Sequence, residues 1–334
     1  MNHVTDDKQP RRIHPGSGRR KGSPFPKGRQ VSPEETAAIE ALLAGREIRR
    51  DELIEYLHLI QDKEGCLPAG HLHALAEIMR IPMAEVYEVA SFYAHFDIVQ
   101  DGEARPEPVT IRVCQSLSCM LAGAEALIAA LEAEKGPGVR IVRAPCMGRC
   151  DTAPVAEAGH RAVDHASAER VLATVAEGAL SPEVPDYQTF EAYQAEGGFD
   201  ILKECLSGKR AADDVIATLS DGGLRGLGGA GFPTGRKWGL VRSEPGPRLM
   251  AINGDEGEPG TFKDRHYLET RPNAFLEGML IGAWAIEAEA VYIYLRDEYP
   301  AARKILQAEI AKVEAAELSP HTRIVLRRGA GAYI

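Results

Sequence analysis

The sequence predicts an α/β fold that begins with a helical bundle, and three stretches carry this prediction. Between residues 31 and 105, apolar residues recur at the spacing of amphipathic helices. From Val109 onward, short strand-like runs alternate with helical segments. Residues 248–252, 291–295 and 323–326 are apolar runs separated by helical segments, which is typical of a parallel sheet covered by helices.

Length and composition describe a globular protein of two or three domains, with 334 residues of which 44% are hydrophobic. No apolar run approaches the roughly 18 residues of a membrane span, and no apolar signal-peptide core is seen. We therefore expect a cytoplasmic protein without membrane insertion. The net charge of −10 argues against nucleic acid as a partner. Six cysteines without an export signal favour metal ligation or reactive thiols over a disulfide scaffold.

The N-terminal part is predicted to contain two regions. Residues 1–30 carry eight Lys/Arg and two Asp among Pro and Gly, which predicts a disordered basic arm, either a solvated tail or a segment that binds an acidic partner surface. Residues 31–105 are the predicted helical bundle. Its first helix has a strong start signal, because Ser32 can cap it, Pro33 suits its first position and Glu35 completes a capping box. Cys66 is expected to be a buried structural thiol.

Residues 106–180 are predicted to form a thioredoxin-like domain. A strand at residues 109–113 is followed by a helix at 122–134, a strand at 139–142, two short strands and a helix from Ser167. Four cysteines lie at the strand ends, as a C-x4-C pair and a C-x3-C pair: Cys114, Cys119, Cys146 and Cys150. This spacing is compatible with three alternatives: a zinc site, a 2Fe-2S cluster and four unrelated core cysteines.

A glycine-rich loop at residues 222–238 is the main motif of the C-terminal region. Seven of its seventeen residues are Gly, and such a loop normally exists because a ligand, here a phosphate-bearing one, must approach the backbone closely. Gly226, Gly228 and Gly231 match G-x-G-x-x-G, but residues 213–219 before them predict a helix rather than a strand, so an ordinary Rossmann site is rejected. A flexible linker is the alternative, and the aromatic Phe232 and Trp238 argue against it.

Charged and polar residues near this loop add to the predicted ligand site. Lys237 and Arg236 lie where a helix start would present cations and N–H groups to an anion. Asn253, Asp255 and Glu256 follow the first apolar run, and ligands of α/β sheets bind beyond the carboxyl ends of strands. Solvated loop acids are the alternative for these three residues.

Together with residues 253–265, the glycine loop closely resembles the flavin subunit of respiratory complex I. The resemblance implies an α/β FMN-binding domain at residues 181–334. It also implies that Phe232 and Glu258 contact NADH, and that the following residues bind FMN: Gly226, Gly228, Gly229, Lys237, Asn253, Asp255 and Glu256. The sequence departs from the family pattern at Leu227, where arginine is usual, and at Leu240, where an aromatic residue is usual.

Residues 31–180 resemble the small 2Fe-2S subunit of complex I, including the stretches 90–93 and 144–150. This implies that Cys114, Cys119, Cys146 and Cys150 hold a 2Fe-2S cluster. Fusion of both modules in one chain resembles the β subunit of molybdenum- or tungsten-dependent NAD formate dehydrogenases, through residues 26–31, 58–62 and 93–96. NAD-reducing hydrogenases have a similar layout.

The resemblance to the formate enzyme implies a diaphorase that exchanges hydride between NAD(H) and FMN and single electrons with iron–sulfur clusters. Its partner would be a catalytic molybdenum or tungsten iron–sulfur subunit. The alternatives are the equivalent subunit of a hydrogenase or of complex I, and a zinc-holding assembly module without redox activity.

The last residues, 329–334, follow directly on a predicted strand. In the resembling family this segment continues into a Cys-Gly-Glu-Glu stretch and later into a 4Fe-4S region. We therefore expect a C-terminally truncated form, with an incomplete FMN domain that binds FMN and NADH weakly.

Overall fold

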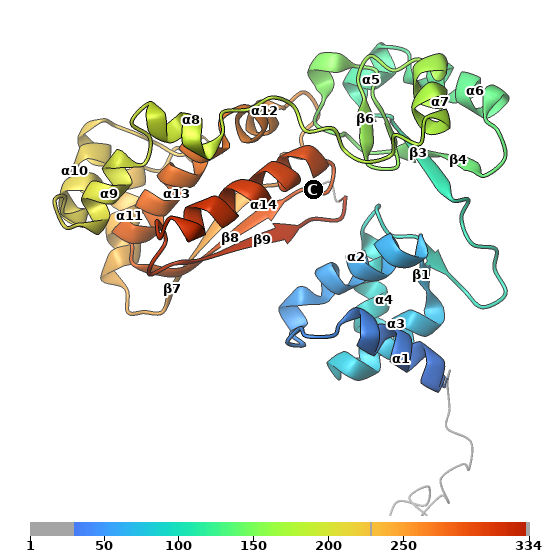
Figure 1. Cartoon of the computed structure of the whole chain (residues 1–334), viewed down its shortest axis with the longest axis horizontal. Coiled ribbons are helices and arrows are strands. Elements are labelled where there is room, and N and C mark those ends of the chain that lie inside the picture. The colour runs from blue at the N-terminus through green and yellow to red at the C-terminus, as the bar shows by residue number, and fades with distance from the viewer. Residues whose placement is uncertain (1–29, 228, 332–334) are drawn as a thin grey trace, which may run out of the picture.

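The computed structural model describes residues 30–227 and 229–331. Figure 1 shows three groups of elements: helices α1–α4, a small sheet with helices α5–α7, and a parallel sheet with helices α8–α14. The predicted basic arm lies outside the described residues except for Gln30, and so does Gly228 of the glycine loop. The architecture confirms the predicted α/β fold that follows a helical bundle.

The N-terminal group contains α1 (Pro33–Leu42), α2 (Leu53–Glu64), α3 (Ala69–Met79) and α4 (Met83–Phe92). A 3-10 turn at Arg50–Glu52 precedes α2, and β1 (Leu67–Pro68) pairs with β2 (Ile98–Val99) in parallel. The predicted capping box is confirmed, since Ser32 Oγ accepts from Glu35 N and Glu35 Oε2 accepts from Ser32 N. The amphipathic faces meet in one core that includes Tyr56, Leu57, Leu72 and Leu75. Cys66 is fully buried beside this core.

The second group has the predicted thioredoxin-like order. Its sheet runs β4-β3-β5-β6, with β3 parallel to β4 and antiparallel to β5. The predicted helix at 122–134 is α6, which begins at Ala124 because Gly123 adopts a left-handed φ of 95°, and a short helix, α5, that the sequence did not predict precedes it. The elements are β3 (Val109–Cys114), α5 (Leu117–Leu121), α6 (Ala124–Glu134), β4 (Val139–Ala144), β5 (Ala156–Ala158), β6 (Arg161–Val163) and α7 (Ala168–Ala176).

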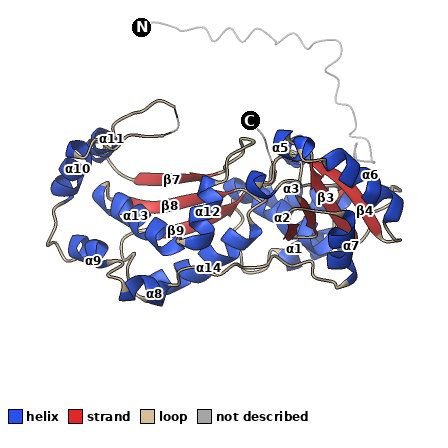
Figure 2. Cartoon of the chain, turned by 90° about the horizontal axis from the view of Figure 1, so that it is seen from above, coloured by secondary structure: helices blue, strands red, loops and turns tan. Residues whose placement is uncertain are grey.

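The third group is built on a parallel sheet of order β7-β8-β9, as the three apolar runs predict. Strand β8 is central and mostly buried, whereas β7 is an edge strand whose exposure alternates. Helices α13 and α14 pack against this sheet (Figure 2). The elements are α8 (Phe190–Ala195), α9 (Asp200–Leu206), α10 (Ala212–Asp221), α11 (Thr234–Ser243), β7 (Arg248–Gly254), α12 (Lys263–Thr270), α13 (Pro272–Ala285), β8 (Ala288–Leu295), α14 (Pro300–Ala315) and β9 (Arg323–Arg328). Among the helices of the described ranges, none combines the length and the apolar character that a membrane crossing requires.

Close packing of α10 against α11 fixes both ends of the glycine loop. Gly235 allows this contact, because a Cβ there would lie 2.6 Å from the Ile216 carbonyl oxygen and 2.2 Å from Ser220 Oγ. The Ile216 oxygen is a backbone atom and cannot rotate away. A side chain at position 235 must therefore separate the two helices.

We expect Gly235→Ala to destabilise the third group by about 1–3 kcal/mol, the usual range for overpacking a tight contact. The midpoint of chemical unfolding, followed by tryptophan fluorescence, measures this, because both Trp residues, Trp238 and Trp284, lie in that group. Gly239→Ala is the matched control one turn later, where the nearest atom lies 4.0 Å away. It should stabilise helix α11 by up to about 1 kcal/mol. Equal unfolding midpoints for the two variants would contradict the packing argument.

Candidate cofactor sites

The structure brings the four predicted cysteines together at one end of the thioredoxin-like sheet. Cys114 ends β3, Cys119 lies in α5, and Cys146 and Cys150 flank the turn that follows β4. Cys114, Cys119 and Cys146 are each 2% exposed, and Cys150 is partly exposed. The sulfurs of Cys146 and Cys150 are 3.5 Å apart. Because the four come from separate elements, their convergence argues against four unrelated core thiols.

Backbone amides surround these sulfurs. Gly148 N donates to Cys146 Sγ at 3.4 Å, and Gly260 N donates to Cys150 Sγ at 3.1 Å. The contact between Cys114 and Cys119 raises the pKa of Cys114 and lowers the pKa of Cys119. The neighbouring Cys114 sulfur and burial raise the pKa of Cys146, and burial raises the pKa of Cys150, while backbone amides partly oppose these shifts. Four thiolates with amide donors are a ligand set that suits an iron–sulfur cluster.

The distances between the sulfurs bear on the choice between a two-iron cluster and a single zinc ion. A tetrahedral zinc with Zn–S bonds of about 2.3 Å places every pair of sulfurs about 3.8 Å apart. Among the described residues, the only group of three or more potential ligand atoms within 4.8 Å of one another is His58, Asp62 and His95. The cysteines do not form such a compact group, and the Cys146–Cys150 distance of 3.5 Å alone fits either metal, so the choice between zinc and a 2Fe-2S cluster rests on the comparisons below.

The glycine loop joins α10 to α11, and a helix precedes it as predicted, not a strand. Its base is closed by a hydrogen bond from Gly226 N to Phe232 O at 3.0 Å and by a bridge between Arg225 and Pro233. Gly229 has a φ of 95°, and no heavy atom lies within 4 Å of where its Cβ would be. The loop thus presents accessible backbone, as the prediction of close ligand approach requires.

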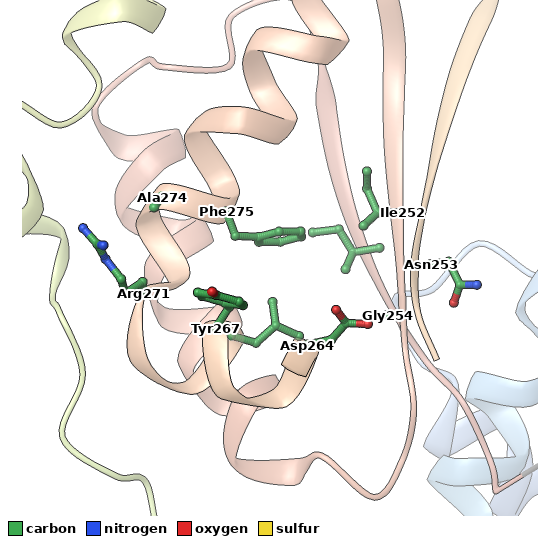
Figure 3. A pocket seen from close by; sticks show the side chains of 10 residues that line it. Ile252, Asn253, Gly254, Asp264, Tyr267, Arg271, Ala274 and Phe275 are labelled. Atoms are coloured by element: carbon green, nitrogen blue, oxygen red, sulfur yellow. The ribbon is translucent and has the colours of Figure 1, made fainter. Parts of the chain in front are cut away.

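A groove beside strand β7 lies next to this loop. One cavity of about 520 Å³ is lined by Lys237, Trp238, Met250 and Phe275. A second, of about 390 Å³, lies at the carboxyl ends of β7 and β8 and is lined by residues of β7, α12 and α13 (Figure 3). Lys237, at the start of α11, is therefore brought to the same groove as the end of β7. These volumes fall within the range of ligand pockets.

Of the three polar residues after the first apolar run, Asn253 is exposed, Asp255 is partly buried and Glu256 is buried. In Figure 3 the Asn253 side chain lies on the opposite side of β7 from Phe275 and Tyr267, and its Oδ1 accepts from Asp255 N at 2.9 Å. Burial raises the pKa of Asp255. Glu256 is 7% exposed, and its carboxylate accepts from Asp264 N, Arg265 N and Tyr299 OH. The Glu256 side chain thus caps α12, and direct contact between Glu256 and a flavin stays a prediction.

The predicted NADH contacts lie on two different loops. Phe232 belongs to the glycine loop, is 42% exposed and lies under the Arg236 guanidinium. Glu258 is exposed in the β7–α12 loop, where its carbonyl accepts from Thr261. Leu227 is 92% exposed and Leu240 is 53% exposed. The assignments of FMN and NADH contacts to individual residues stay predictions.

A contact that the sequence did not predict connects the cysteine loop to the third group. Arg265 is 8% exposed and donates to Gly148 O at 2.9 Å, Asp151 Oδ1 at 2.8 Å and Glu269 Oε2 at 3.1 Å. Arg296 donates to the carbonyls of Cys146 and Glu256. A Cβ on Gly148 would lie 2.1 Å from the Tyr299 hydroxyl. Glycine at position 148 thus allows the cysteine loop to pack directly against Tyr299.

We expect Arg265→Met to destabilise the protein by about 1–3 kcal/mol, because the buried Gly148 carbonyl and Glu269 carboxylate lose a charged hydrogen-bond donor, although Arg149 stays 3.4 Å from Glu269. The carboxylates left behind are those of Glu269 and Asp151. Thermal unfolding of the cofactor-loaded protein measures the loss. The exposed Arg46→Met is the control, and we expect it to change stability by less than about 0.5 kcal/mol. Similar stability of the two variants would contradict a structural role for Arg265.

Comparison with known proteins identifies both modules. Residues 39–179 match the family model of the thioredoxin-like [2Fe-2S] ferredoxins, and residues 219–334 match that of the Nuo51 FMN-binding domain. The chain is therefore a fusion of a 2Fe-2S ferredoxin module and an FMN-binding module. These matches, with the relatives below, support a 2Fe-2S cluster, FMN and NAD(H) as its cofactors.

The chain is a homologue of two kinds of NAD-linked subunit. It is 40% identical to an NADH-quinone oxidoreductase subunit of Rhizobium meliloti, over 46% of this chain and 38% of that protein. It is 29% identical to the NAD-reducing hydrogenase HoxS subunit alpha of Cupriavidus necator, over 85% of this chain and 54% of that protein. A crystal structure of an NAD+-reducing [NiFe]-hydrogenase in the H2-reduced state matches with a TM-score of 0.68 and 28% identity, over 86% of this chain and 52% of that one. The chain thus spans about half the length, or less, of these relatives.

Proposed function

We propose that the chain is a diaphorase-type electron-transfer subunit, exchanging hydride between NAD(H) and FMN and single electrons with iron–sulfur clusters. The observation that supports this best is the contact between the two cofactor-associated loops, where Gly260 of the β7–α12 loop donates to Cys150 Sγ at 3.1 Å. When bound, FMN takes up electrons as a pair and releases them singly, which matches a hydride donor to a cluster.

Each part of the chain has a separate task in this proposal. The accessible glycine-loop backbone and Lys237 at the start of α11 would bind the FMN phosphate, since helix N-termini and cations both favour anions. Cys114, Cys119, Cys146 and Cys150 would bind the cluster. Arg265 and Arg296 would hold the cysteine loop against the β7–α12 loop and so fix the separation of the two cofactors.

An absorption spectrum and an NADH titration test this function. We expect the purified protein, with cofactors reconstituted, to show flavin and ferric-sulfide bands, and anaerobic NADH to bleach the flavin band. A colourless protein that contains stoichiometric zinc would instead support the alternative of a non-redox assembly module. Flavin and cluster bands that NADH does not bleach would count against NAD(H) as the electron donor.

Within this activity, we propose that the chain serves a formate dehydrogenase with a molybdenum or tungsten iron–sulfur subunit. The support is the resemblance carried by residues 58–62 and 93–96. The hydrogenase is the second candidate, and its specific support is the match of HoxS subunit alpha over 85% of the chain.

Isolation of the native complex from its source distinguishes the two. A formate dehydrogenase should contain molybdenum or tungsten and reduce NAD+ with formate. A hydrogenase should contain nickel and reduce NAD+ with hydrogen. A complex that does neither would leave the diaphorase assignment in place and remove both partner assignments.

A further inference from the structure

Two buried histidines outside both cofactor sites lie close to the Asp62 side chain, at the junction of the first and third groups. His58 lies in α2, His95 follows α4, and they are 3% and 7% exposed. Their ring centroids are 5.0 Å apart. One ligand atom from each of His58, Asp62 and His95 lies within 4.8 Å of the others. The proposed electron-transfer function uses none of these three residues.

Hydrogen bonds place a proton on one nitrogen of each imidazole. His58 Nε2 lies 2.7 Å from the Gly329 carbonyl oxygen, which can only accept, so Nε2 carries the proton. His95 Nδ1 lies 2.7 Å from the Asp297 carboxylate and is protonated for the same reason. The other nitrogens, His58 Nδ1 and His95 Nε2, are buried and have no hydrogen-bond partner among the described residues, and the same holds for Arg328 Nη2.

This arrangement is the one that metal-binding histidines show. A ligating imidazole usually donates its second N–H to a carboxylate or a backbone carbonyl, which fixes the tautomer and the ring orientation. Asp297 does this for His95, and Gly329 does it for His58. Asp297 is itself held by Arg328, which also contacts Asp62 at 2.7 Å.

A bound water molecule is the competing occupant. Water could donate to the two imidazole nitrogens and accept from Arg328 Nη2, a buried donor without a partner among the described residues, so the metal-binding measurements below must distinguish it from a metal ion. A cation can bind all three ligand atoms, and the carboxylates of Asp62 and Asp297 together offset its charge against that of Arg328, which contacts both. Nitrogen and carboxylate ligands together suit a divalent ion of the first transition row.

We propose that His58, Asp62 and His95 form a binding site for a divalent first-row transition metal such as Zn2+, with a water as the fourth ligand. The site is structural. It joins α2 and the segment after α4 to the end of β9, where His95 N also donates to Ala330 O at 3.0 Å. It contains no cysteine, so its metal is independent of the 2Fe-2S cluster.

We test this site by measuring how much Co2+ and Zn2+ the full chain binds. The 2Fe-2S cluster is assembled beforehand, and no chelator is present. We expect about one Co2+ per chain with visible bands of nitrogen and oxygen ligation and without sulfur charge-transfer bands. The double variant His58→Gln/His95→Gln should not bind this Co2+ ion. The control His321→Gln, which replaces an exposed histidine elsewhere in the chain, should still bind it. Zn2+ should raise the unfolding temperature of the wild type and of His321→Gln, but not that of the double variant.

A second variant covers the case in which the double variant does not fold. Asp62 is 43% exposed at its side chain, so Asp62→Asn should fold, and we expect it to weaken Zn2+ binding at least tenfold. Unchanged affinity in Asp62→Asn would overturn the proposal. A wild type that binds no more metal than the double variant would also overturn the proposal, since it would show a water-filled site. Bound Co2+ with sulfur charge-transfer bands would overturn it as well. None of these outcomes bears on the flavin or on NADH reactivity.

Discussion

Replacing Cys146 by Ser is expected to abolish, or to change beyond recognition, the EPR signal of the reduced 2Fe-2S cluster. Cys146 lies centrally in the cysteine group, since it contacts both Cys114 and Cys150. A cluster that loses one of four thiolates keeps an incompletely ligated iron, and a serine hydroxyl is a harder and more weakly acidic ligand. The same loss is expected for Cys114, Cys119 and Cys150.

Two other cysteines of the chain provide matched controls. Cys66 and Cys205 are also free and buried, at 0% and 1% exposure, but lie in the first and third groups. Cys66→Ser and Cys205→Ser introduce the same buried hydroxyl and should leave the EPR signal unchanged. A wild-type signal in all four ligand variants would exclude the cysteine group as the cluster site. Loss of the signal in a control variant would show that the assay reports on stability instead of ligation.

The sequence was sufficient to predict the elements whose pattern is local. Residues 109–113 alternate like a strand, and the order of strands and helices after them predicted that Cys114 and the C-x3-C pair lie at corresponding strand ends. The structure brings these cysteines together. The capping box at Ser32 and the parallel sheet of β7, β8 and β9 were predicted for the same reason. In each case a short period or a fixed spacing determines the structure.

Contacts between the groups could not be predicted, because they depend on how distant segments meet. No local pattern indicates that Gly148 packs against Tyr299, or that Arg265 donates to the cysteine loop. Glu256 shows the same limit within the site. Its position after a strand suggested a ligand contact, but the N–H groups at the start of α12 lie close enough to take its carboxylate. The histidine pair was visible in the sequence only as two separate residues.

Replacing Gly229 by Val is expected to remove FMN from the protein while leaving the cluster in place. Gly229 adopts a φ of 95°, where a β-branched residue is strained, and its surroundings are open. Holding a side chain in this left-handed region costs about 1–2 kcal/mol per residue, equivalent to roughly a tenfold loss of affinity at 1.4 kcal/mol per decade. A branched Cβ that points into the space of a closely approaching ligand adds a steric clash to this strain. We therefore expect FMN content to fall by well over tenfold.

Gly208→Val is the matched control for that experiment, because Gly208 also has a positive φ, of 75°, and no atom within 4 Å of its Cβ position. It follows α9, outside the glycine loop, so it imposes a similar backbone strain without occupying the predicted ligand space. Flavin fluorescence after denaturation measures the FMN content of both variants, and the EPR signal of the reduced cluster shows that residues 106–180 remain folded. Loss of FMN from Gly229→Val alone assigns flavin binding to the loop. Stoichiometric FMN in Gly229→Val would place the flavin elsewhere, and equal loss in both variants would assign the effect to strain in the third group.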